Sequence, residues 1–150
     1  MDATSAPAPE PDAPALPAEG PPRRRLLLLY WLPLALYVGL IFALSSLSRF
    51  PFALPPVRHL DKLIHAAEYA ALAFLLTRAL WAERPRARPW LLLAGAVLLV
   101  AALGLADELY QRSVPNRDSD ALDLAADCAG GLVGATLYLA VRRVFTRARS

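Results

Sequence analysis

The stretch LLLLYWLPLALYVGLIFALSSL, residues Leu26–Leu47, contains no charged side chain. A second uncharged stretch, WLLLAGAVLLVAALGLA, covers Trp90–Ala106. A helix needs about 17–25 mostly apolar residues to cross roughly 30 Å of hydrocarbon, and both stretches approach or exceed that length. The sequence therefore predicts an integral membrane protein whose spans are helices.

The composition of the whole chain supports this prediction. Of its 150 residues, 57% are hydrophobic and 19% are charged, whereas a soluble domain has about 45–50% apolar and about 25% charged residues. The apolar residues fall in four blocks, which predict spans over about 26–48, 57–82, 90–111 and 120–141. We expect an all-α, polytopic membrane protein, a bundle of four transmembrane helices in which neighbours are antiparallel.

The two ends of the chain differ from the blocks between them. Residues 1–22 are rich in Pro and Ala and have little to bury, so we expect a disordered N-terminal tail. The transmembrane domain is expected over 23–141, followed by a basic cytoplasmic tail over 142–150. Arg23, Arg24 and Arg25 could open a signal peptide. The apolar run after them is too long for one and no A-x-A-like site follows, which favours an uncleaved anchor.

The basic residues predict how the chain is oriented. A net charge of +3 could suggest nucleic acid binding, but the arginines cluster beside the spans, so we expect no nucleic acid partner. With the N-terminus inside, eleven Lys and Arg residues fall on the inner side and five on the outer side. The positive-inside rule then predicts a multi-pass protein of the cell membrane with both termini cytoplasmic.

Ionisable residues gather at the outer ends of three predicted spans. Asp61, His65 and Glu68 follow an i, i+4, i+7 pattern and share one helix face, with Glu68 about 10 Å deeper than Asp61. In the third span Glu108 and Gln111 share a face. Charged groups inside a span are costly and therefore suggest a function.

The fourth span carries a similar stripe, with Asp120, Asp123 and Asp127 at i, i+3 and i+7. Gly130 and Gly134 continue the face of Asp123 and Asp127, and small residues at four-residue intervals let helix backbones approach closely. The acidic face is therefore expected to point into the bundle. Asp120 is also a candidate cap for the fourth helix.

We expect a polar, outward-facing pocket that binds an anionic lipid-linked or cell-wall-related molecule, with Lys62 and Arg117 meeting a phosphate. Membrane lipid is the other expected partner, and the oligomeric state is left open. The candidate ligand-binding residues are Asp61, Lys62, His65, Glu68, Glu108, Gln111, Arg117, Asp123 and Asp127.

The same residues are open to other kinds of chemistry. One histidine among many carboxylates fits zinc weakly, and no recognisable calcium loop is present, so no metal and no cofactor is expected. An enzyme acting on a lipid-linked substrate would use His65 and Glu108 as an acid/base pair. A structural or assembly protein would use the same polar groups to hold the helices together. Four spans without internal repeats disfavour a transporter.

Several motifs, in this order and at these spacings, resemble the VanZ-like family of small bacterial membrane proteins. They are Leu44-Ser45-Ser46, Asp61-Lys62-Leu63-Ile64-His65, Glu108-Leu109-Tyr110-Gln111, Pro115-Asn116-Arg117, Asp123 and Gly130. Asp127 is a departure, because the family often has Asn there. The resemblance covers Trp31 to about Gly134. It implies a bacterial cell-membrane protein with an envelope or glycopeptide antibiotic-resistance role, and it implies no reaction.

Overall fold

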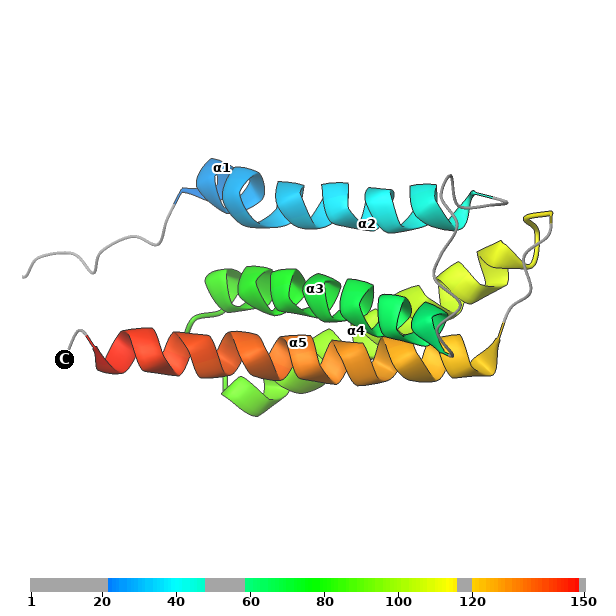
Figure 1. Ribbon diagram of the computed structural model, residues 1–150. Coiled ribbons are helices and arrows are strands. Elements are labelled where there is room, and N and C mark those ends of the chain that lie inside the picture. Colours follow the sequence, from blue (N-terminus) through cyan, green and yellow to red (C-terminus); the bar gives the residue numbers. More distant parts are fainter. Residues whose placement is uncertain (1–21, 48–58, 116–119, 149–150) are drawn as a thin grey trace, which may run out of the picture.

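The computed structural model describes residues 22–47, 59–115 and 120–148. Its helices are α1 (Arg23–Leu26), the π-helical turn η1 (Leu27–Trp31), α2 (Leu32–Ser45), α3 (Leu60–Glu83), α4 (Pro89–Gln111) and α5 (Ala121–Arg147). Since α1, η1 and α2 are continuous, the described residues contain four helices long and apolar enough to cross a membrane (Figure 1). The prediction of an all-α fold with four spans is confirmed.

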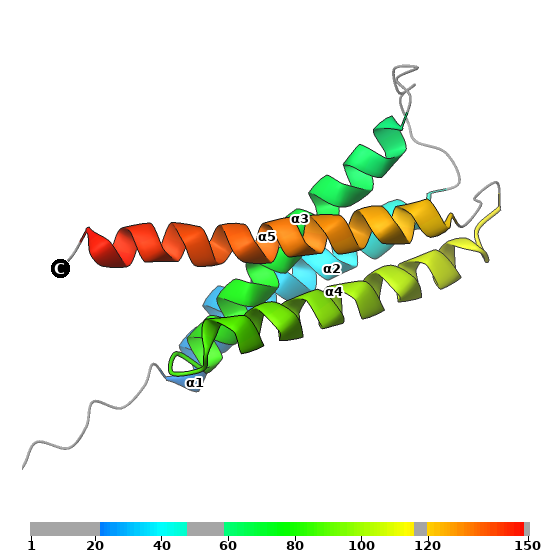
Figure 2. The ribbon, with the colours of Figure 1, turned by 90° about the horizontal axis from the view of Figure 1, so that it is seen from below.

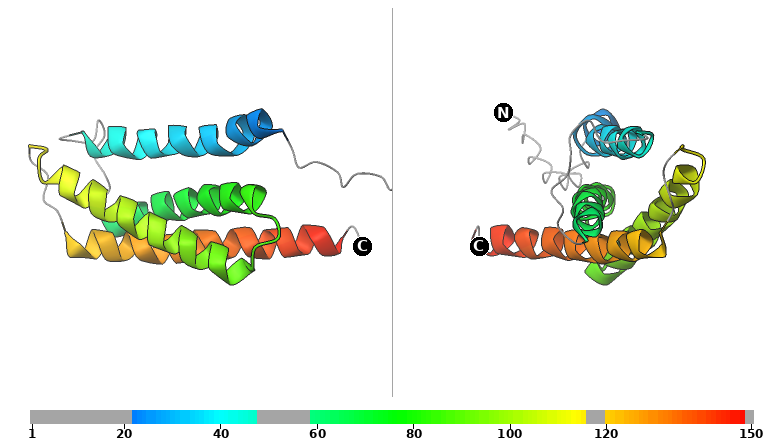
Figure 3. Two further views of the ribbon diagram at one scale, coloured as in Figure 1. Left: turned by 180° about the vertical axis from the view of Figure 1, so that it is seen from behind. Right: turned by 45° about the vertical axis from the view of Figure 1, so that its right-hand side comes forward.

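The spans alternate in direction, so Pro22 and Ala148 lie at the same end of the bundle (Figure 1). We call this the terminal end and the opposite end, where α3 and α5 begin, the distal end. α3 lies between α2 and α5, and α4 crosses the face of the bundle that Figure 3 (left) brings forward. Consecutive spans are antiparallel as expected, but the pair in most extensive contact, α3 and α5, is parallel.

Glycines explain why α3 and α5 pack so closely. A Cβ added at Gly130 or Gly134 of α5 would collide with the backbone carbonyl of Ala66 or Ala70 of α3. The helices cross at this contact (Figure 2), which matches the close approach that small residues allow in membranes. A Cβ added at Gly131 of α5 would collide with the Val100 side chain of α4.

The apolar core follows the middle of α3. Leu72, Ala73 and Leu76 are buried there, together with Val100 of α4 and Ala135 of α5. Large apolar side chains also point outward along the spans, among them Leu36, Leu98, Leu132 and Val133. An apolar exterior of this kind is what a lipid environment accommodates.

The fourth helix is longer than expected. α5 continues to Arg147, past the predicted end of the span at Val141. The guanidinium of Arg142 lies 3.6 Å from the ring centroid of Trp81 on α3, and this cation–π contact adds to the packing of the extra turns.

The first span contains an irregular turn with an identifiable cause. Pro33 has no N–H, and in an α-helix its amide would bond the carbonyl of Leu29. The Nη1 atom of Arg78 on α3 donates to that carbonyl at 2.9 Å instead, and its guanidinium lies 4.4 Å from the ring centroid of Tyr30. In lipid a freed backbone carbonyl needs such a partner, so Arg78 stabilises the turn.

Replacing Arg78 tests this role. We expect Arg78→Ala to lower the free energy of unfolding by about 1–3 kcal/mol, because a carbonyl in apolar surroundings loses its charged donor. Pro33→Ala supplies an amide for Leu29, so part of the loss should be recovered in the double variant. Equilibrium unfolding in mixed micelles measures both, and equal losses with and without Pro33→Ala would contradict the assignment.

The glycine contact gives a second prediction. Gly130→Ala and Gly134→Ala should each cost about 1–3 kcal/mol, because the added methyl forces α3 and α5 apart. Gly39 and Gly95 have nothing within 4 Å of an added Cβ, so Gly39→Ala and Gly95→Ala are matched controls expected within about 0.5 kcal/mol of the parent. The same unfolding assay compares all four. Similar losses in every variant would mean that close packing is not what these glycines provide.

Candidate functional site

Lys62 is surrounded by three carboxylates at the distal end. Its Nζ lies 2.9 Å from Asp61 Oδ2, 2.7 Å from Asp120 Oδ2 and 2.6 Å from Asp123 Oδ1. An ammonium has three N–H donors, so these carboxylates match its full donor set. The Lys62 side chain is 18% exposed. It joins the start of α3 to the start of α5.

Asp120 caps α5, as the sequence suggested. Its Oδ1 accepts from the N–H of Leu122 at 2.9 Å, and its own N–H donates to Glu108 Oε2 of α4 at 3.0 Å. The Lys62 ammonium, with the Leu122 N–H, holds the pKa of the Asp120 carboxyl below its usual value. Asp120 therefore connects three helices at one point.

His65 and Asp127 form a buried pair between α3 and α5. His65 Nδ1 lies 3.0 Å from Asp127 Oδ1, and Asp127 is 0% exposed. His65 Nε2 lies 3.9 Å from Asp123 Oδ2. The pair lies one turn from the contact between Gly130 and Ala66, which fixes the distance between the two helices.

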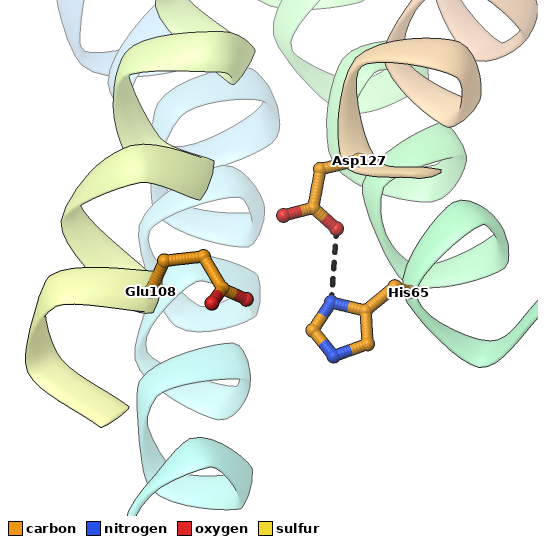
Figure 4. A group of neighbouring side chains, drawn as sticks. All are labelled: His65, Glu108 and Asp127. Carbon is orange, nitrogen blue, oxygen red and sulfur yellow. Dashed lines mark hydrogen bonds and ion pairs between the residues drawn. The ribbon is translucent and has the colours of Figure 1, made fainter. Parts of the chain in front are cut away.

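Glu108 completes this group from α4. One ligand atom each from His65, Glu108 and Asp127 lies within 4.8 Å of the others. The Glu108 carboxylate points toward the other two side chains (Figure 4). Glu108 is 5% exposed. Within the described part of the chain, its Oε1 atom and Asp127 Oδ2 are buried and have no hydrogen-bond partner.

Gln111 belongs to a second polar group, between α2 and α4. Its Nε2 donates to Asp107 Oδ2 at 2.9 Å and to Ser45 Oγ at 3.3 Å, and Ser45 Oγ donates to the same Asp107 oxygen at 2.9 Å. Next to them, the Ser46 hydroxyl bonds the Phe42 carbonyl and the Tyr110 hydroxyl. These serines bond the helix backbone and a neighbouring helix.

The predicted site residues are therefore distributed over more than one group. Asp61, Lys62, His65, Glu108, Asp123 and Asp127 lie together between α3, α4 and α5, whereas Gln111 bonds toward α2. Glu68 is half-buried, and its backbone carbonyl accepts from the Tyr37 hydroxyl of α2 at 3.2 Å. Arg117 lies outside the described residues.

Two features were predicted from the sequence only in part. Asp107 is 1% exposed and bonds toward α2, although the sequence already signals it as an acid inside an apolar span. A recess of about 310 Å³ also opens between α4 and α5, lined by Leu105, Glu108, Leu109, Arg112, Asp120, Ala121 and Leu124. The sequence predicts a polar, outward-facing pocket that includes Glu108. It does not predict that Leu105, Leu109 and Arg112 line the recess, because the walls come from two helices.

Comparison with known proteins gives a family. No curated protein and no solved structure matches the chain. The sequence model of the family described as VanZ/LLP1 matches residues 23–142, which include the first three spans, the fourth up to Arg142 and the distal polar residues. The chain is a multi-pass membrane protein and belongs to the VanZ/LLP1 family.

Proposed function

We propose that the protein binds the headgroup of an anionic lipid-linked molecule of the cell envelope at its distal end. The recess between α4 and α5 is the observation that carries this proposal. Leu105, Leu109 and Leu124 line it together with Arg112, Glu108 and Asp120. A lining that combines leucines with charged groups suits a molecule with an apolar chain and a charged head. The chain would contact the leucines and the head would contact the charged side chains.

The charge for an anionic head would come from Arg112, which follows α4 directly and is exposed. A guanidinium can donate two parallel hydrogen bonds to a phosphate. The three carboxylates around Lys62 use its donors, so a phosphate would have to displace one of them. We therefore assign Lys62 to holding the acids in position, and we keep Arg117 from the sequence as a second phosphate contact.

The orientation of the site is part of the proposal. Arginines are numerous near the terminal end, for example in the turn between α3 and α4. The positive-inside rule then supports cytoplasmic termini and a site that faces outward. An outward site suits a lipid-linked cell-wall precursor as the bound molecule. A role in the response to glycopeptide antibiotics, which the family resemblance implies, would follow from binding it.

A specific contact favours a second candidate, a membrane enzyme acting on a lipid-linked substrate. The hydrogen bond between Asp127 Oδ1 and His65 Nδ1, at 3.0 Å, would fix the imidazole and its tautomer. This is the arrangement in which a carboxylate prepares a histidine for acid/base work. Glu108 would be the partner acid.

The binding proposal predicts the effect of removing Arg112. A polyprenyl phosphate should bind purified protein in micelles more tightly than a polyprenol of equal length, and Arg112→Ala should weaken its binding about tenfold. That corresponds to about 1.4 kcal/mol, within the range for a hydrogen bond to a charged group. Arg86→Ala, an exposed arginine in the turn at the other end, is the control. Equal affinities for phosphate and alcohol would refute the proposal.

The enzyme candidate makes a separate prediction. Purified protein incubated with a lipid extract should convert one lipid-linked species, detected by mass spectrometry. His65→Asn should abolish the conversion while the melting temperature stays within a few degrees of the parent. If no lipid changes in mass, or if conversion survives His65→Asn, the acid/base assignment fails.

A further inference from the structure

We propose that His65, Glu108 and Asp127 bind one divalent first-row transition metal ion at the distal end of the bundle. These residues come from α3, α4 and α5, and they bring one nitrogen and two carboxylates to one place. The inference concerns the interior of the helix bundle rather than the recess, and it stands without the lipid proposed above.

The charges inside the bundle carry the argument. Lys62 is paired with Asp61, Asp120 and Asp123, which leaves Glu108 and Asp127 with the imidazole of His65. When both buried carboxylates are ionised, the group keeps a net negative charge even with the ring protonated. Burying such a charge without a partner costs free energy. A bound cation would therefore stabilise this group.

Two unpaired oxygens point to where the cation would bind. Glu108 Oε1 and Asp127 Oδ2 are buried without a hydrogen-bond partner in the described part of the chain, and both residues are at least nine-tenths buried. The Glu108 carboxylate points toward His65 and Asp127 (Figure 4). Gly104 leaves room for the Asp127 carboxylate, because a Cβ there would lie 2.8 Å from Oδ2.

The nitrogen donor favours a transition metal over magnesium or calcium, which prefer oxygen ligands. An imidazole nitrogen is a ligand for zinc, iron, nickel and copper, and carboxylates bind manganese and zinc as well. Metal–ligand bonds of about 2.0–2.2 Å keep the ligands within about 4.4 Å of one another. The ligand atoms here already lie within 4.8 Å, so small rotations of the side chains would suffice. Glu108 also lines the recess, which gives an ion a route from the distal end.

Metal titration of purified protein tests the inference. After treatment with a chelator, the full chain in micelles should bind about one equivalent of Mn²⁺ or Zn²⁺ by calorimetry and elemental analysis, and the ion should raise its melting temperature. Glu108→Gln and Asp127→Asn should each weaken binding at least tenfold and remove the thermal shift.

Glu83→Gln is the matched control, because it removes an exposed carboxylate at the terminal end of α3 and should leave metal binding unchanged. Helix content by circular dichroism checks that each variant is folded, and Glu108→Gln provides the test if Asp127→Asn does not fold. Absence of binding, preference for Mg²⁺ or Ca²⁺, or equal weakening by Glu83→Gln would overturn the inference.

The same samples separate this inference from the proposed function. Polyprenyl phosphate binding is measured on metal-free and metal-loaded protein. Lipid binding by protein that takes up no metal would overturn the metal site and leave the headgroup proposal standing. Metal uptake by protein that does not bind the lipid would give the reverse result.

Discussion

The backbone contact between α3 and α5 is the constraint on which the distal site depends. Gly130 and Gly134 lie against the carbonyls of Ala66 and Ala70, and His65 immediately precedes Ala66 in sequence. Asp127 is three residues before Gly130, about one helical turn. Because the two helices are this close and run in the same direction, the imidazole and the carboxylate meet at hydrogen-bond distance. A side chain at either glycine would separate the helices and with them the pair.

Much of this arrangement could be predicted from the sequence. The four apolar blocks gave the number and type of the spans, because the thickness of a bilayer sets how long they must be. The inward direction of Asp123 and Asp127 followed from the glycines on the same helix face. The cap at Asp120 followed from a carboxylate at the start of a helix.

Other features depend on which helices are neighbours, and a sequence pattern does not supply that information. Asp107 and Glu108 are adjacent in sequence, yet side chains about 100° apart on a helix meet different partners. One bonds Ser45 of α2 and the other faces His65 of α3. The hydrogen bond from Arg78 to the Leu29 carbonyl could likewise not be predicted, because it joins residues far apart in the chain.

The way the first span is attached has a consequence for handling the protein outside a bilayer. This span is the least covered by other helices, with 11% of its most apolar window buried against 39% for that of Leu60–Glu83. Charged partners hold it near its two ends, at Arg78 and at Asp107, and one neutral hydrogen bond, from Tyr37 to the Glu68 carbonyl, lies nearer its middle. Such bonds are stronger where water cannot compete. A detergent that admits water at the ends of the bundle would therefore loosen the first span before it disturbs the other three.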